Sequence, residues 1–132
     1  MINIASWNIR GLNASIKQAR VRDFIRNNSV SLCAILETLV KSETLLEVCA
    51  RTFGRFEWVS NQMQSTNGTR IILAWDVRIM DVVVLEVHNQ YLHCEIHIRN
   101  FSTPIFMSLF MGRVKRMLEE NYGLVYENSK FS

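Results

Sequence analysis

No apolar run in the 132-residue sequence approaches the length of a membrane-spanning helix. The first residues also lack the pattern of a secretory signal, because Asn3, Ser6, Asn8 and Arg10 interrupt the apolar stretch. These two absences predict an intracellular, non-secreted protein with no membrane partner. They leave open whether the protein resides in the nucleus or the cytoplasm.

Cysteine is scarce, and its spacing excludes a metal or redox motif of the CxxC type. The three cysteines, Cys33, Cys49 and Cys94, are far apart and odd in number. Cys33 and Cys94 lie in apolar, strand-like runs. We expect both to be buried free thiols in a reducing compartment.

The remaining composition is that of one globular domain, with 48% hydrophobic and 20% charged residues. The net charge of +3 is mild, so it permits an anionic partner without requiring one. Basic residues cluster between Arg10 and Arg26 and again between Arg113 and Arg116. The simplest interpretation of these clusters is a solvated helix face.

The hydrophobic pattern predicts two strand–helix units followed by strands alone. The strand at 2–8 precedes a helix at 15–28, and the strand at 30–36 precedes a helix capped by Ser42. The turn signal Asn67–Gly68 and the single proline, Pro104, separate later strands. The predicted strands of this second part are 56–60, 69–75, 81–88, 91–98 and 104–111, with a short helix near 114–121. This βαβα order followed by a β-meander predicts a mixed α/β sheet with helices on at least one face.

Two polar residues stand at the ends of the first two predicted strands. Asn8 ends one and Glu37 ends the other, and a single helix connects the strands. A crossover of this kind makes the strands parallel, so their carboxyl ends meet at one edge of the sheet. A carboxylate with a neutral oxygen ligand suits Mg²⁺, which keeps most of its waters. Asn8 as a cap of the following turn and Glu37 as a solvated loop acid remain the alternatives.

The segments around these residues resemble a known family. "SWNIRGLN" at 6–13 and "LCAILET" at 32–38 are similar to motifs of the endonuclease/exonuclease/phosphatase family, whose fold is that of deoxyribonuclease I. "NGTRIILAWD" (67–76), "QYLHCEIHI" (90–98) and "PIFMSLFMG" (104–112) resemble, in order and spacing, the endonuclease domain of plant non-long-terminal-repeat (LINE-type) retrotransposon polyproteins. The resemblance covers about residues 1–112.

The resemblance implies a Mg²⁺-dependent phosphodiesterase with a nucleic acid, DNA, as the ancestral substrate. Asn8 and Glu37 match the family's metal-binding and catalytic asparagine and glutamate. The implied fold is a four-layer α/β sandwich, of which this chain would form the N-terminal half. Arg10, Asn67 and Arg70 lie near strand ends or turns and are candidates for contacting phosphate.

Later parts of the sequence depart from the family pattern. Met111 stands where the family has tyrosine, and Val114 stands where a polar residue is expected. No aspartate follows Asp81, so the family's late aspartate–asparagine and aspartate–histidine pairs are missing. We therefore expect a truncated domain at 1–112 followed by a divergent tail at 113–132. The second sheet would be mostly missing, which would expose an apolar face to self-association or a protein partner.

Three functions are compatible with this pattern. The first is a retrotransposon-derived endonuclease domain that keeps half of its site and is inactive alone. The second is an active Mg²⁺-dependent nuclease completed by a partner chain. The third is a non-catalytic module that binds nucleic acid or protein. The alternating His93, Glu95 and His97 are interpreted as a strand face in preference to a zinc site, and the three tryptophans as core residues in preference to base-stacking platforms.

Overall fold

The computed structural model describes residues 2–62, 68–110, 113–116 and 125–128. Up to residue 110 the elements follow the predicted order and, with the exceptions given below, the predicted bounds; the segment expected as a divergent tail adds two strands that were not predicted. They are β1 (Asn3–Asn8), α1 (Ser15–Asn27), β2 (Val30–Val40), α2 (Leu45–Phe53), β3 (Glu57–Ser60), β4 (Thr69–Trp75), β5 (Met80–Val87), β6 (Tyr91–Ile98), β7 (Ile105–Phe110), β8 (Arg113–Arg116) and β9 (Val125–Asn128). No helix in these described ranges is long and apolar enough to cross a membrane.

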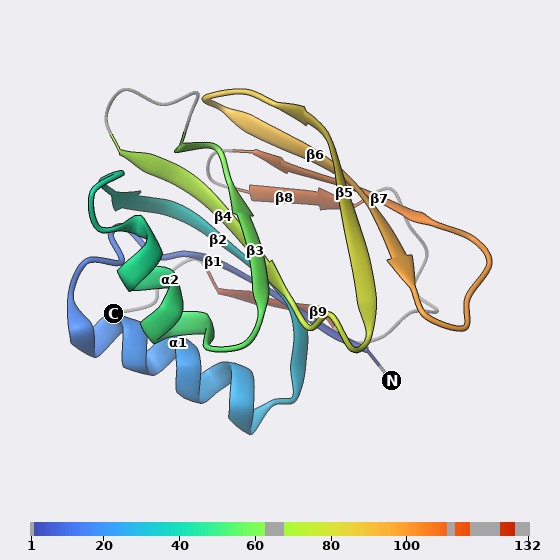
Figure 1. The fold of residues 1–132 in the computed structure, drawn as a ribbon, viewed down its shortest axis with the longest axis horizontal. Coiled ribbons are helices and arrows are strands. Elements are labelled where there is room, and N and C mark those ends of the chain that lie inside the picture. Colours follow the sequence, from blue (N-terminus) through green and yellow to red (C-terminus); the bar gives the residue numbers. More distant parts are fainter. Residues whose placement is uncertain (1, 63–67, 111–112, 117–124, 129–132) are drawn as a thin grey trace.

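Two sheets form the framework of the molecule (Figure 1). The first sheet is mixed and has the strand order β3-β4-β2-β1-β9. In it β1 and β2 are parallel, as a strand–helix–strand crossover requires. The second sheet has the order β5-β6-β7-β8, and its neighbouring strands are antiparallel. This arrangement confirms the predicted mixed α/β fold.

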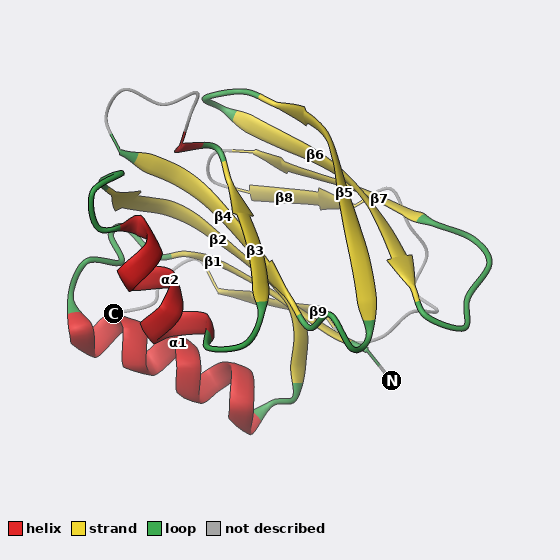
Figure 2. Ribbon diagram, viewed as in Figure 1, coloured by secondary structure: helices red, strands yellow, loops and turns green. Residues whose placement is uncertain are grey.

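The two sheets pack face to face, and both helices cover the other face of the first sheet (Figure 2). Alternation along β1 explains this layering, because Ile4 points between the sheets while Ala5 and Trp7 point toward the helices. Trp7 meets Phe24 of α1 edge-on, with 4.8 Å between ring centroids. Trp7 and Trp75 are buried and Trp58 packs against the helix-side cluster, which confirms that the tryptophans belong to the core.

The expectation of an uncovered first sheet is wrong. The second sheet covers it with buried side chains from each of β5, β6 and β7, including Met80, Leu92 and Met107. The exposed large apolar residues of this sheet, Val83, Leu85 and Phe106, do not belong to the core between the sheets. The β-meander alone therefore suffices to build the second sheet, because its strands pair sequentially through short turns.

Three local predictions need correction. Ser42 does not cap α2, which begins after Thr44, and its hydroxyl donates to Glu43 instead. Residues 114–116 belong to strand β8 and not to a helix, while 117–121 lie outside the described residues. The pairing of β8 with β7 across the second sheet outweighs the weak helical pattern. Strand β2 continues past Glu37 to Val40 through an irregular segment.

Gly68, the described half of the predicted turn, approaches this irregular segment closely. Its φ is +89°, and a Cβ placed there would lie 3.2 Å from the carbonyl carbon and oxygen of Leu39. We expect Gly68→Ala to lower the free energy of unfolding by about 2 kcal/mol, because both the conformation and the contact are unfavourable. Gly54→Ala is the control, since Gly54 also has positive φ but no atom within 4 Å of such a Cβ. Equal losses for both variants in urea denaturation would contradict the close-approach argument.

Candidate metal and phosphate site

Asn8 and Glu37 meet at one edge of the first sheet, as predicted. In the parallel register of β1 and β2, Asn8 lies opposite Leu36, the residue before Glu37. Beyond Asn8 the chain stays beside β2, and the amide of Ile9 donates to the carbonyl of Leu36 at 3.0 Å. The two candidate residues are therefore on neighbouring strands at the same end of the sheet.

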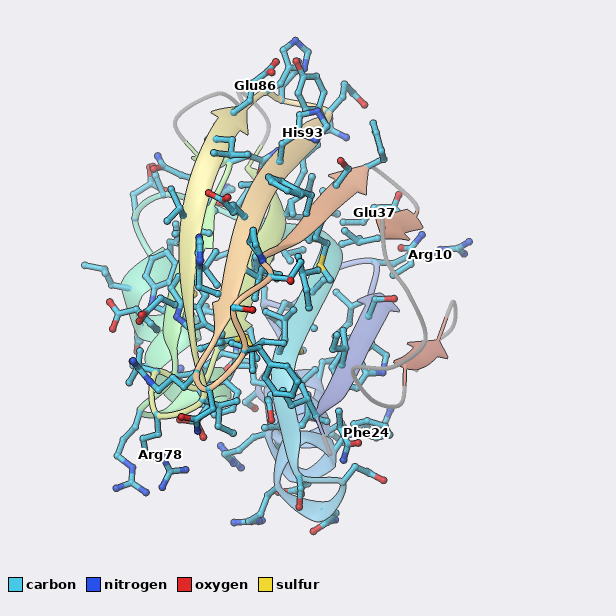
Figure 3. The ribbon with its side chains drawn as sticks, turned by 90° about the vertical axis from the view of Figure 1, so that its right-hand side faces the viewer. Arg10, Phe24, Glu37, Arg78, Glu86 and His93 are labelled. Atoms are coloured by element: carbon cyan, nitrogen blue, oxygen red, sulfur yellow. The ribbon has the colours of Figure 1, made fainter. Side chains whose placement is uncertain are left out.

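The segment after β1 follows the irregular end of β2 closely. The amide of Gly11 donates to the carbonyl of Glu37, and the amide of Leu12 donates to that of Thr38, both at 2.8 Å. Figure 3 shows the side chains of Arg10 and Glu37 on the same side of the molecule. These hydrogen bonds hold the backbone next to Arg10 against that of Glu37. A residue with a guanidinium and a residue with a carboxylate are therefore neighbours at this end of the sheet.

The backbone here has an unusual concentration of positive φ angles. Arg10 (53°), Glu37 (56°) and Leu39 (55°) adopt the left-handed region although none is glycine. Each such residue costs on the order of 1 kcal/mol, and such conformations concentrate at functional sites. They also interrupt the alternation of side chains along β2, so the direction of Glu37 is set by the irregularity and not by the strand.

Polar side chains from α1 and the preceding loop hold this segment in place. Lys17 donates from Nζ to the carbonyls of Ile9 and Arg10, each at 3.2 Å. The buried Gln18 donates from Nε2 to the carbonyl of Leu12 at 2.9 Å. Lys17 therefore supports the backbone of the site, which corrects its interpretation as one more residue of a solvated basic face. Arg20 and Arg22 on the same helix are exposed, as that interpretation expects.

Asn8 carries a buried oxygen without a partner. Among the described residues, its Oδ1 is inaccessible to solvent and accepts no hydrogen bond; Asn3, Gln18 and Thr69 also carry such an atom, but of the four residues only Asn8 ends the strand beside Glu37. A buried carbonyl-type oxygen left unpaired costs about 1–3 kcal/mol, so an atom of this kind calls for a ligand. A hydrated divalent cation beside Glu37 would satisfy it, since oxygen ligands and retained waters are what Mg²⁺ prefers. The residues present thus fit the implied metal.

The other residues predicted to contact phosphate do not all lie beside Asn8 and Glu37. Arg10 is exposed beside Glu37, while Arg70 lies on β4 across from the irregular segment of β2. Because its neighbour Ile71 packs between the sheets, Arg70 belongs to the helix-facing side, whereas Asn8 shares the side of Ile4. Asn67 and Met111 lie outside the described residues.

Other chemistry is limited in the described part of the chain. No group of three or more histidine, cysteine, aspartate and glutamate side chains forms there. His93 instead contacts Ser108 through Nδ1 at 2.7 Å, and His97 lies 3.4 Å from Glu95. Burial raises the pKa of the Cys33 thiol well above its ordinary value and that of Cys94 to about 12, so neither supplies a thiolate at neutral pH.

Sequence reasoning missed two residues that organise this end of the molecule. Thr38 is fully buried and donates from Oγ1 to the carbonyl of Thr69 at 2.6 Å, which ties the irregular segment to β4. Asn61 is also fully buried and bonds backbone groups of both sheets. For Asn61 the available signal was a polar residue directly following a strand, a place where short polar side chains bond the backbone; Thr38 lies within β2 and gave no such signal.

Comparison with solved structures supports the fold assignment. The chain is similar to the structure entitled "Endonuclease domain of TRAS1, a telomere-specific non-LTR retrotransposon", with a TM-score of 0.54 and 13% identity over 79% of this chain. This is a deoxyribonuclease I-like fold. No protein-family model and no curated protein sequence matches the chain.

The deoxyribonuclease I-like fold is shared over part of the solved domain. The match spans 42% of that domain's chain, so this chain covers less than half of its length. At this level of identity the likeness concerns the fold alone. The exact family, the plant affinity and the roles of Asn8 and Glu37 remain predictions.

Proposed function

We propose that this chain carries the metal-binding and phosphate-binding half of a retrotransposon-type endonuclease site. Glu37 holds Mg²⁺, Asn8 binds the hydrated ion or a phosphate oxygen, and DNA is the substrate class. The observation that carries the proposal is the buried, unpaired Oδ1 of Asn8 on the strand next to Glu37, in a deoxyribonuclease I-like fold.

Each residue of the half-site has a definite task. The Glu37 carboxylate supplies the negative charge that retains a divalent cation. Asn8 presents Oδ1 toward the ion and can donate from Nδ2 to a phosphate oxygen. Arg10, whose backbone is held beside Glu37 by the Gly11–Glu37 hydrogen bond, contacts the nucleic-acid backbone, and Asn67 is a further candidate; Arg70 faces the helices and would reach phosphate only around the end of the sheet. When bound, Mg²⁺ polarises a phosphoryl oxygen and stabilises the leaving alkoxide.

We infer that the half-site has no general base among the described residues. The three histidines of the sequence are His88, His93 and His97, and no aspartate follows Asp81. His93 is engaged with Ser108, and His97 lies beside Glu95. Activation of the attacking water requires a base within hydrogen-bonding reach of it. The proposal is therefore that this chain by itself binds metal and phosphate without completing hydrolysis.

Nicking of supercoiled plasmid by the purified chain tests this proposal. We expect no nicking above background in Mg²⁺ or in chelator, while a short DNA duplex binds with an affinity that falls as salt rises. Glu37→Gln is assayed in parallel, together with circular dichroism to show that both proteins are folded. Nicking that requires both Mg²⁺ and Glu37 would contradict the half-site proposal and show that the chain is a complete nuclease. Absence of both DNA binding and metal binding would reject the proposal altogether.

A further inference from the structure

A second polar site lies at the opposite end of the sheets. A cavity of about 590 Å³ opens between the last turns of α1 and α2 and the turn that joins β4 to β5. Arg78 of that turn projects from the end of the molecule opposite Glu37 and Arg10 (Figure 3). The volume is within the roughly 300–1,000 Å³ typical of small-molecule pockets. This cavity is thus separate from the proposed metal and phosphate site.

Four arginines line the cavity: Arg22, Arg26, Arg55 and Arg78. Arg78 forms a bidentate salt bridge with Asp76, with Nε 3.0 Å from Oδ1 and a terminal nitrogen 2.8 Å from Oδ2. These hydrogen bonds lower the pKa of the Asp76 carboxyl, which is therefore ionised and already paired at neutral pH. Arg26 pairs with Asp23 at 2.8 Å, and Arg22 lies 4.0 Å from the same carboxylate and donates to the carbonyl of Arg51 at 3.1 Å.

The arginines retain a positive excess after these pairs are counted. Four guanidiniums face two carboxylates, Asp76 and Asp23, which leaves two positive charges. The ends of α1 and α2 contribute about half a negative charge each, which offsets part of this excess. Arg55 is exposed and forms no hydrogen bond or salt bridge with a residue in the described ranges; its charge attracts the nearby Asp76 carboxylate, and its guanidinium remains available to a ligand.

The interior of the cavity is apolar and partly aromatic. Phe53, Phe56, Ile25 and Ile79 contribute to its wall, and Phe56, Ile25 and Ile79 are only partly buried. Partly exposed apolar side chains beneath charged guanidiniums favour a ligand with two parts. Its body must be apolar and preferably aromatic, and its charged group must be an anion that accepts hydrogen bonds from arginine.

We propose that this cavity binds a small aromatic molecule bearing a phosphate group, the chemistry of a nucleoside monophosphate. The aromatic body packs against the partly exposed Phe56, and the phosphate accepts hydrogen bonds from Arg55 and from Arg22 nitrogens not used in its bond to the Arg51 carbonyl. The site does not depend on the metal and phosphate site, because the two lie at opposite ends of the sheets. Failure of one assignment leaves the other intact.

The test follows amide chemical shifts of the whole chain during titration with phenyl phosphate and with adenosine monophosphate. Chelator is present throughout, so that a metal at Glu37 does not contribute. We expect saturable shifts at Gly54, Arg55 and Val77, which border the cavity. Inorganic phosphate, which has no apolar body, is expected to bind roughly tenfold more weakly because it buries no ring.

Arg55→Gln and Arg20→Gln form the matched pair of variants. Arg55 is exposed and unpaired within the described ranges, so its replacement leaves the fold intact, and affinity for phenyl phosphate should fall about fivefold. Arg20 lies exposed on α1 outside the cavity lining, and Arg20→Gln should leave affinity unchanged. Equal weakening by both variants, shifts spread over the basic helix face, or no saturation up to about 10 mM ligand would each overturn the proposal.

Discussion

Glu37→Gln is expected to weaken divalent-cation binding by roughly tenfold or more, because it removes the charged ligand of the proposed site. Mn²⁺ is a suitable probe, since it prefers the same oxygen ligands as Mg²⁺ and broadens nearby amide signals. In the unmodified chain we expect selective broadening at Asn8, Ile9 and Thr38, which adjoin the two candidate ligands. In the variant this broadening should vanish at the same Mn²⁺ concentration.

Glu37→Gln is chosen because it removes the charge of the side chain without requiring a change in backbone conformation. Glutamine keeps the size of the side chain, and Glu37 has a positive φ of 56° that glutamine must also adopt, so stability should change little. Glu57→Gln removes the same charge from an exposed position on β3 and should leave the broadening unchanged. If both variants bind Mn²⁺ as the unmodified chain does, Glu37 is not a metal ligand and the Asn8–Glu37 site is a structural feature only.

The sequence predicted that Asn8 and Glu37 lie at the same end of the first sheet because the features that decide this placement are local. Strand periodicity, one intervening helix and a polar residue at each strand end suffice to bring Asn8 and Glu37 to one edge. The same reasoning correctly predicted the mixed sheet and the buried tryptophans. Such predictions succeed where neighbouring residues in the chain determine the outcome.

The features that sequence reasoning missed depend on contacts between distant segments. The positive φ of Glu37 and Leu39 is stabilised by hydrogen bonds to residues 11–13 and by Thr38 bonding Thr69. None of these hydrogen bonds can be predicted from the sequence pattern of either segment alone. The covering of the first sheet was also mispredicted, because a resemblance to only the N-terminal part of the family fold was taken to mean that the second sheet is mostly missing. Their alternating apolar residues, such as those of β6, prove sufficient.

Asn61 is the clearest example of such a distant contact, and Asn61→Ala is expected to be strongly destabilising. Its Oδ1 accepts from the amides of Arg70 (3.1 Å) and Ile71 (2.9 Å) at the start of β4. Its Nδ2 donates to the carbonyls of His88 and Asn89, each at 3.1 Å, in the turn between β5 and β6. One fully buried amide thus joins the two sheets at the end that holds Asn8 and Glu37.

Alanine would remove a hydrogen bond from each of these four backbone groups and open a small cavity; the His88 carbonyl would keep only a long hydrogen bond from the Tyr91 amide, at 3.4 Å. Each unpaired buried group costs about 1–3 kcal/mol, and partial rehydration recovers some of it, so we expect a loss of about 3–5 kcal/mol. Urea denaturation measures this loss. Asn89→Ala is the control, because the exposed Asn89 contributes its backbone carbonyl but no side-chain bond to this junction, and its loss should stay within about 0.5 kcal/mol.

Hydrogen exchange locates the effect of the same variant. The amides of Arg70 and Ile71 should exchange faster in Asn61→Ala, because their acceptor is gone, while those of Ala5 and Cys33 in the centre of the first sheet should change only with global stability. Since Thr69 also accepts the hydrogen bond of Thr38, loosening of β4 at this point would reach the irregular segment that contains Glu37. A loss below about 1 kcal/mol with unchanged exchange at Arg70 and Ile71 would mean that the sheets are held together by their apolar interface alone. The geometry of the proposed metal site would then be independent of the second sheet.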